Sequence, residues 1–249
     1  MTERLSTQAA SSKPELSFSL ASCQLTLFTP EEEISSVKII RDLLPKWDEL
    51  FGNAEPIILP SVPGMPREIP RLIIKSTDEV WRCEIASERI NLVWEARIEP
   101  KTATVASVQN KGIKVLIDYK EFLNARVTRM AAVITRIRPM SKPAMFLAEH
   151  FCKPQWLKAP LNRPESFELH AHKKYQLDSG LKVNSWVRNK TGSLLADQSP
   201  VVVVEQDLNT LVEESSTNNF DSGAIRHFFS SVPAEFDTIL NLYYPTGAA

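Results

Sequence analysis

The 249-residue sequence predicts an α+β protein, with antiparallel sheet and helices packed on one face of it. Segments of alternating apolar and polar residues, typical of strands, occur in groups of three separated by short polar turns. Segments with apolar residues three and four apart, typical of helices, stand on either side of these groups. Both halves of the chain follow the order strand, helix, proline-rich connector, three strands, helix, at an offset of about 95–110 residues. We therefore expect a duplicated unit whose sheet keeps a second face free to bind a partner.

The first half of the chain is expected over residues 15–125, after a mobile tail of residues 1–14 that shows no periodicity. Alternation from Leu16 to Phe28 predicts a strand. Thr29 is a cap candidate followed by proline and three glutamates, which is the pattern of a helix N-terminus. Apolar residues then recur at helical spacing for about twenty residues, and Pro45 should kink or divide this helix.

The remainder of the first half begins with a stiff connector, because five prolines lie between residues 56 and 70. Three strands separated by polar turns follow at residues 71–76, 81–86 and 89–96. A helix is expected over residues 102–123, with Gly112 as its weak point because glycine lowers helix stability.

The second half, residues 126–249, repeats this order. Its predicted strands are residues 126–138, 166–176, 181–189 and 201–208. A short helix over residues 143–152 and three further prolines follow the first of them. The last predicted helix covers residues 221–242, and Pro233 puts its continuity at risk.

Charge is segregated along the chain, although 29 Lys+Arg nearly balance 30 Asp+Glu. Residues 1–110 carry 12 basic and 16 acidic side chains, residues 111–190 carry 16 and 6, and residues 191–249 carry 1 and 8. The net charges of the three segments are therefore −4, +10 and −7. A basic segment between acidic ones predicts either a positive surface for an anionic partner or ion pairs between segments inside the fold.

The first of these alternatives predicts a nucleic-acid surface in residues 126–174, where aromatic residues are interleaved with basic ones. Its candidate anion-binding residues are Arg126, Arg136, Arg138, Lys142, Lys173 and Lys174. On a strand the three arginines would share a face, with Arg129 on the opposite one. Strong phosphate binders usually have a pI above about 9, whereas the pI of this sequence is about 6.5. Internal pairing is therefore the favoured interpretation.

Two patterns raise the question of a metal site. His170 and His172 would share a strand face, with His150 and Cys152 upstream as further ligands. The two lysines after His172 would repel a cation, so a polar strand face is the better interpretation and we expect no bound metal.

A second pattern lies near the C-terminus, where Asp207 and Asn209 would present two oxygen ligands on one strand face. This spacing is compatible with a divalent-metal-dependent hydrolase. An acidic rim at the end of a strand explains the same residues and is favoured.

Motifs that carry catalysis are absent from the sequence. The seven glycines never form Gly-x-Gly, which excludes the dinucleotide-binding fingerprint and the phosphate-binding loop. Gly-x-Ser-x-Gly, His-Glu-x-x-His and Cys-x-x-Cys are absent as well. We therefore expect no cofactor and favour a protein without enzymatic activity, while four histidines leave a nucleophile–base pair open.

Composition also bears on location. The sequence has no run of about 18 apolar residues and no secretory signal pattern, so we expect no membrane contact. Three widely spaced cysteines are typical of reduced thiols and indicate a cytoplasmic protein.

A family resemblance rests on two regions. One contains Pro70-Arg71-Leu72-Ile73-Ile74, then Asp78, then Arg89-Ile90-Asn91-Leu92-Val93-Trp94; the other contains Asp207-Leu208-Asn209-Thr210 before an aromatic-rich last helix. These features resemble a sporadically distributed, uncharacterised bacterial family of about this length. The chain departs from that family where Leu92 and Val93 separate Asn91 from Trp94, which are adjacent in the family pattern. The resemblance implies a mobile gene linked to defence against phage and carries no catalytic residues.

The leading hypothesis is a non-enzymatic recognition protein that binds a protein partner, in the setting of a bacterial defence system. The alternatives are a nucleic-acid-binding protein using residues 126–174 and a divalent-metal-dependent hydrolase using Asp207 and Asn209. The oligomeric state stays open.

Overall fold

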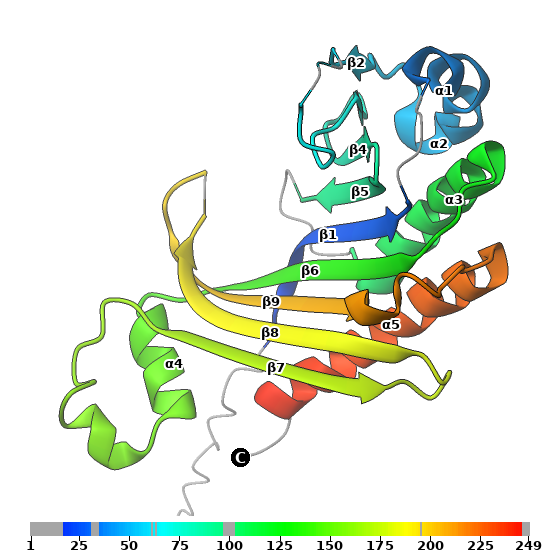
Figure 1. Cartoon of the computed structure of the whole chain (residues 1–249). Coiled ribbons are helices and arrows are strands. Elements are labelled where there is room, and N and C mark those ends of the chain that lie inside the picture. The colour runs from blue at the N-terminus through cyan, green and yellow to red at the C-terminus, as the bar shows by residue number, and fades with distance from the viewer. Residues whose placement is uncertain are drawn as a thin grey trace, which may run out of the picture.

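The computed structural model describes residues 17–30, 35–60, 62, 64–96, 103–194 and 196–245. The predicted tail, residues 1–14, lies outside this range. The described residues form one nine-stranded antiparallel sheet with helices packed against it (Figure 1), which confirms the α+β class.

The elements of the first half are β1 (Ser19–Phe28), α1 (Ser36–Asp42), the 3₁₀ helix η1 (Leu44–Trp47), α2 (Asp48–Phe51), β2 (Ile57–Ile58), β3 (Leu72–Lys75), β4 (Trp81–Ala86), β5 (Arg89–Glu95) and α3 (Val105–Leu123). Those of the second half are β6 (Arg129–Pro139), α4 (Pro143–Phe151), η2 (Pro154–Leu157), β7 (Glu168–Gln176), β8 (Lys182–Ser193), β9 (Pro200–Thr210), η3 (Val212–Glu214) and α5 (Ser222–Tyr243).

The two halves have the same topology, as the repeated order predicted. The strand order is β2-β3-β4-β5-β1-β6-β9-β8-β7. In each half, three successive strands form a meander and the last of them pairs with the first strand of that half: β5 with β1, and β9 with β6. The halves join through β1 and β6, which pair from Ser19–Ile137 to Phe28–Arg129. The expected boundary at residues 125 and 126 therefore falls in the α3–β6 loop, and the sheet continues across it.

One face of the sheet is covered by helices. Leu25 and Leu27 on β1 point to this face and are at most 1% exposed, and Thr26 between them points to the other face. Helices α3 and α5 lie next to each other across the covered face (Figure 1). The α1–α2 segment adds Trp47 and Phe51 to the same core, and α4 packs through Leu147 on β8 and β9. The strand alternation seen in the sequence is thus the alternation between these two faces.

Helix boundaries correct two expectations. The first helix is capped by Ser35, whose Oγ accepts a hydrogen bond from Lys38 N at 3.4 Å, and not by Thr29. Pro45 does divide it, since a 3₁₀ turn that has this proline near its start separates α1 from α2. Pro233, by contrast, lies inside a continuous α5. Val232 and Phe236 on either side of it are fully buried, so packing against the sheet outweighs the lost backbone hydrogen bond.

None of the helices in the described part of the chain is both long and apolar enough to cross a membrane.

Candidate functional site: the helix-free face of the sheet

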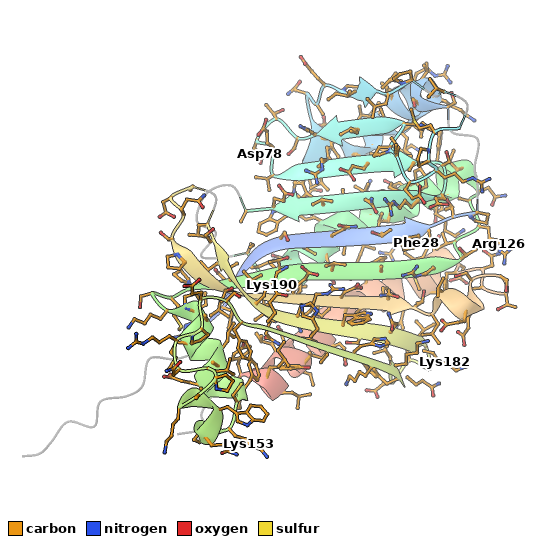
Figure 2. All side chains as sticks on the ribbon, turned by 60° about the vertical axis from the view of Figure 1, so that its left-hand side comes forward. Phe28, Asp78, Arg126, Lys153, Lys182 and Lys190 are labelled. Atoms are coloured by element: carbon orange, nitrogen blue, oxygen red, sulfur yellow. The ribbon has the colours of Figure 1, made fainter. Side chains whose placement is uncertain are left out.

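The face of the sheet opposite α3 and α5 carries no α-helix in the described ranges; the short η3 lies at one rim of it. We call this surface the helix-free face. Its side chains stand along the strands in Figure 2, where Phe28 marks one end. In the second half the residues at its centre are Arg129, Asn184, Trp186, Arg188, Glu205, Asp207, Asn209 and His172.

A chain of hydrogen bonds joins two opposite charges on this face. Arg129 Nη2 on β6 donates to Asn209 Oδ1 on β9 at 3.1 Å, and Asn209 Nδ2 donates to Asp207 Oδ1 at 2.9 Å. The guanidinium of Arg129 also lies over the Phe28 ring, 4.5 Å from its centroid. Arg129 and Asp207 form no ion pair within 4 Å, so the Asn209 amide connects them. We call these three residues the Arg–Asn–Asp relay.

Burial perturbs both charged groups of the relay. It raises the pKa of the Asp207 carboxyl, against the opposing effects of the Asn209 hydrogen bond and of Arg188 and Arg129. It lowers the pKa of the Arg129 guanidinium, against the attraction of Asp207 and Glu213. The Nε of Arg129 is buried without a hydrogen-bond partner among the described residues. Arg129 and Asp207 are thus charged groups that are partly desolvated although no helix covers them, and this desolvation has a cost in free energy.

An aromatic pair extends the relay toward the edge of the sheet. The His172 and Trp186 rings on β7 and β8 stack at 4.2 Å with 15° between their planes, and Arg188 lies 5.5 Å from the Trp186 ring. Asn184 links this pair to the relay, because it bonds to the Nε2 of His172 and donates to Asn209 Oδ1 at 3.5 Å. Polar and flat aromatic side chains therefore form a connected surface from β6 to β7.

Replacing Asp207 by Asn should stabilise the protein at neutral pH. The raised pKa means that the ionised carboxyl is less favourable in the folded than in the unfolded chain, so above its unfolded pKa Asp207 opposes folding. The amide cannot ionise, and it can still accept the hydrogen bond from Asn209. We expect a higher free energy of unfolding for Asp207→Asn at pH 7, measured by urea denaturation. The difference should shrink as the pH falls through the raised pKa.

The control for this experiment is Asp178→Asn on the exposed β7–β8 turn, where we expect no comparable gain in stability at pH 7. A loss of stability in Asp207→Asn at pH 7 would show that the ionised carboxylate supports the fold.

The six candidate anion-binding residues do not come together as one surface. Arg136 and Arg138 do share a face, with Arg129 opposite, but it is the helix-covered one. Arg136 bonds to Gln206 and Asp237 there, and Arg138 lies 5.5 Å from the Phe146 ring.

The remaining candidates are dispersed as well. Lys173 also faces the helix side, 4.1 Å from the Tyr175 ring, whereas Lys174 lies on the helix-free face and pairs with Glu213. Arg126 precedes β6 and donates to two backbone carbonyls in the loop after η3. Lys142 is exposed at the start of α4.

Internal pairing accounts for much of the charge segregation. In the described part of the chain, five ion pairs join the basic segment 111–190 to the acidic segment 191–249: Arg136–Asp237, Lys174–Glu213, Lys182–Glu214, Arg188–Glu205 and Lys190–Glu205. Four of the five link β7 or β8 to β9 or to the η3 that follows it. The basic and acidic segments are thus neighbours in one part of the sheet.

The candidate ligands of the two metal hypotheses are not arranged as a metal site in the described part of the chain. His150 lies on α4 with its ring stacked 4.9 Å from Tyr244, on the opposite side of the sheet from His170 and His172. Asp207 and Asn209 share a face as predicted, but Asn209 Oδ1 accepts from the cationic Arg129. Within the described ranges, no three His, Cys, Asp or Glu residues are grouped so that they could hold a metal ion.

Neither a family model nor a curated protein matches the chain.

Sequence reasoning found only part of this site. The strand alternation assigned Arg129 to the opposite face from the other arginines, and the Asp207–Asn209 pair was singled out for its oxygen atoms. Their connection through Asn209, and the Trp186–His172 stack beside them, depend on which strands are neighbours. The order β6-β9-β8-β7 supplies that information.

Proposed function

We propose that this is a non-enzymatic, cytoplasmic recognition protein that binds a protein partner through the helix-free face. The observation that carries the proposal is the relay, which lies on a face that no α-helix of the described chain covers. Burial lowers the pKa of Arg129 and raises that of Asp207, so it disfavours the charged form of both side chains. Perturbed ionisable groups on an uncovered surface are typical of binding sites. A partner that hydrogen-bonds to them would offset their desolvation cost.

The chemistry of this face fits a protein better than a polyanion. Arg129 and Arg188 offer donors, while Asp207 and Glu205 offer acceptors a few strand positions away. Peptide groups carry both a donor and an acceptor, so they can use both kinds of side chain. The two carboxylates would repel phosphates. Trp186 adds the flat aromatic surface that is enriched at protein interfaces.

The resemblance to a sporadically distributed bacterial family extends the proposal to a role in a multi-component defence system. The genes beside the coding gene test this extension. Neighbouring phage-defence genes in several genomes support it, and a constant housekeeping neighbourhood contradicts it.

The binding proposal is tested by affinity capture from a nuclease-treated extract of the source cells. Wild-type protein should retain a protein that His172→Ala/Trp186→Ala does not. The captured protein is then purified, and we expect its affinity for this double variant to be at least about tenfold weaker than for wild type.

The matched control is Leu242→Ala, an exposed apolar side chain at the end of α5 on the other side of the sheet, which should capture as wild type does. Equal capture by all three proteins would refute the role of the helix-free face. Turnover of a nucleotide or nucleic acid that a point change abolishes would refute the non-enzymatic assignment.

A further inference from the structure

A second surface, outside the helix-free face, lies in the segment that follows β6. Residues 142–167 form a lobe of α4, η2 and the chain leading to β7, which extends beyond the ends of β7 and β8 (Figure 1). We call it the α4–η2 lobe. Figure 2 shows Lys153 at its far end, away from Lys182 on the sheet.

In the described part of the chain, the exposed cations of this lobe are unpaired, unlike several cations of the neighbouring strands. The exposed basic residues of the lobe are Lys142, Lys153, Lys158 and Arg163. None of them forms an ion pair within 4 Å among the described residues, whereas the lysines of β7 and β8 that pair with Glu205, Glu213 and Glu214 are neutralised. With only Glu149 and Glu165 in the lobe, its net charge is +2. The lobe therefore carries basic side chains that no ion pair among the described residues neutralises.

An exposed tryptophan lies in the chain between two of these cations. Trp156 lies in η2 and is 48% exposed, although large aromatic side chains are usually well buried. Lys153 and Lys158 are the two residues that flank η2. The turn is held by hydrogen bonds from Trp156 N to Lys153 O and from Leu161 N to Trp156 O, both 2.9 Å. The ring and its flanking cations are thus presented by a defined turn.

We propose that the α4–η2 lobe binds single-stranded nucleic acid, with Trp156 stacking on a base and the four cations contacting phosphates. A flat exposed ring with basic side chains on both sides is the arrangement by which single strands are bound without sequence preference. The double-stranded form offers no unstacked base to the ring. This surface shares no residue with the helix-free face, so the proposal stands independently of the partner-binding function.

An anionic membrane is the other surface to which a basic lobe with a tryptophan could bind, and the lobe does not fit it. Insertion requires several apolar side chains on one exposed face. Among the large apolar residues of the described lobe, Trp156 alone is exposed. The apolar residues of α4 pack against the sheet instead, where Leu147 and Ala148 are fully buried.

The experiment measures fluorescence anisotropy of labelled dT and U 20-mers titrated with the purified full-length protein. We expect binding whose affinity falls with salt at a log–log slope of about −2 to −3, as four phosphate contacts on a single strand give. Trp156→Ala should weaken binding about tenfold, and Lys153→Gln/Lys158→Gln by a similar factor at low salt. All three positions are exposed, and circular dichroism verifies that the variants fold.

The matched control is Lys114→Gln/Lys182→Gln, which removes the same charge at two exposed lysines that are paired with Asp118 and Glu214. It should bind the oligonucleotides within about twofold of wild type. No binding by wild type at low salt would overturn the proposal, as would equal weakening by the control. Binding to phosphatidylserine vesicles but not to either oligonucleotide would assign the lobe to membranes instead. The assay contains no protein partner, so its failure is distinct from that of affinity capture.

Discussion

Gly112→Val should lower the free energy of unfolding by about 3 kcal/mol, the effect of forcing volume into a filled core. Gly112 lies in α3 where this helix crosses β1 and β5. A Cβ at this position would stand 2.8 Å from Leu25 Cδ1 and 2.8 Å from Leu92 Cδ2. Both leucines are at most 1% exposed, so their methyl groups can move only into the close-packed core.

The sequence alone suggests the opposite for a small residue at this position. Because glycine costs a helix about 1 kcal/mol relative to alanine, helix propensity predicts that Gly112→Ala is stabilising. Because α3 lies so close to the sheet here, we expect Gly112→Ala to be destabilising instead. We expect Gly112→Ala to lose up to about 1 kcal/mol, since overpacking outweighs the gain in propensity.

Both variants are measured by guanidinium denaturation, with Lys111→Val as the control at the exposed neighbouring position of α3. That control should lose less than about 1 kcal/mol, from helix propensity only. If Gly112→Val were as stable as Lys111→Val, α3 would not pack against Leu25 and Leu92 as described.

Arg136→Ala should lower the free energy of unfolding by about 3 kcal/mol. Arg136 is 6% exposed under α5, where Nη1 donates to Gln206 Oε1 at 3.1 Å and Nη2 bonds to Asp237. Removing the side chain leaves the fully buried Gln206 oxygen without this donor and opens a cavity. Most of the loss comes from these buried contacts, because the side chain of Asp237 is 64% exposed.

Asp237→Asn is the comparison that separates these contributions. It removes the exposed charge and keeps the buried contacts of Arg136, so a loss below about 1 kcal/mol is expected. Equal losses in Arg136→Ala and Asp237→Asn would mean that the ion pair, and not the bond to Gln206, holds α5 on the sheet.

The pattern of apolar and polar residues along the chain was sufficient to predict most of the helices and strands. The strand β4 lies at residues 81–86 as expected, and β5 and α3 differ from expectation by at most three residues at either end. The duplicated topology also followed from the order of elements. Local preference was insufficient at two positions: α5 continues through Pro233, and Gly112 lies at a close contact of α3 with the sheet.

The candidate sites were less accessible to sequence reasoning. The segregation of charge can be read from the sequence. The sequence by itself did not decide between a positive surface and ion pairs inside the fold. Arg136 and Lys153 belong to the same basic segment; one is buried beneath α5 and the other is exposed on the lobe.

The sequence by itself thus determined the α+β class, the two equivalent halves and the two sides of each strand, because hydrophobic periodicity records which side of an element is buried. Tertiary structure alone decided which charges are neutralised and which remain exposed. Ion pairing depends on distances between strands that are far apart in the chain, and only the order β6-β9-β8-β7 brings Lys190 and Arg188 to Glu205. Salt screens the attraction between exposed charges beyond about 10 Å, so no count of charges along the chain could show which cations are paired on the sheet and which are unpaired on the lobe.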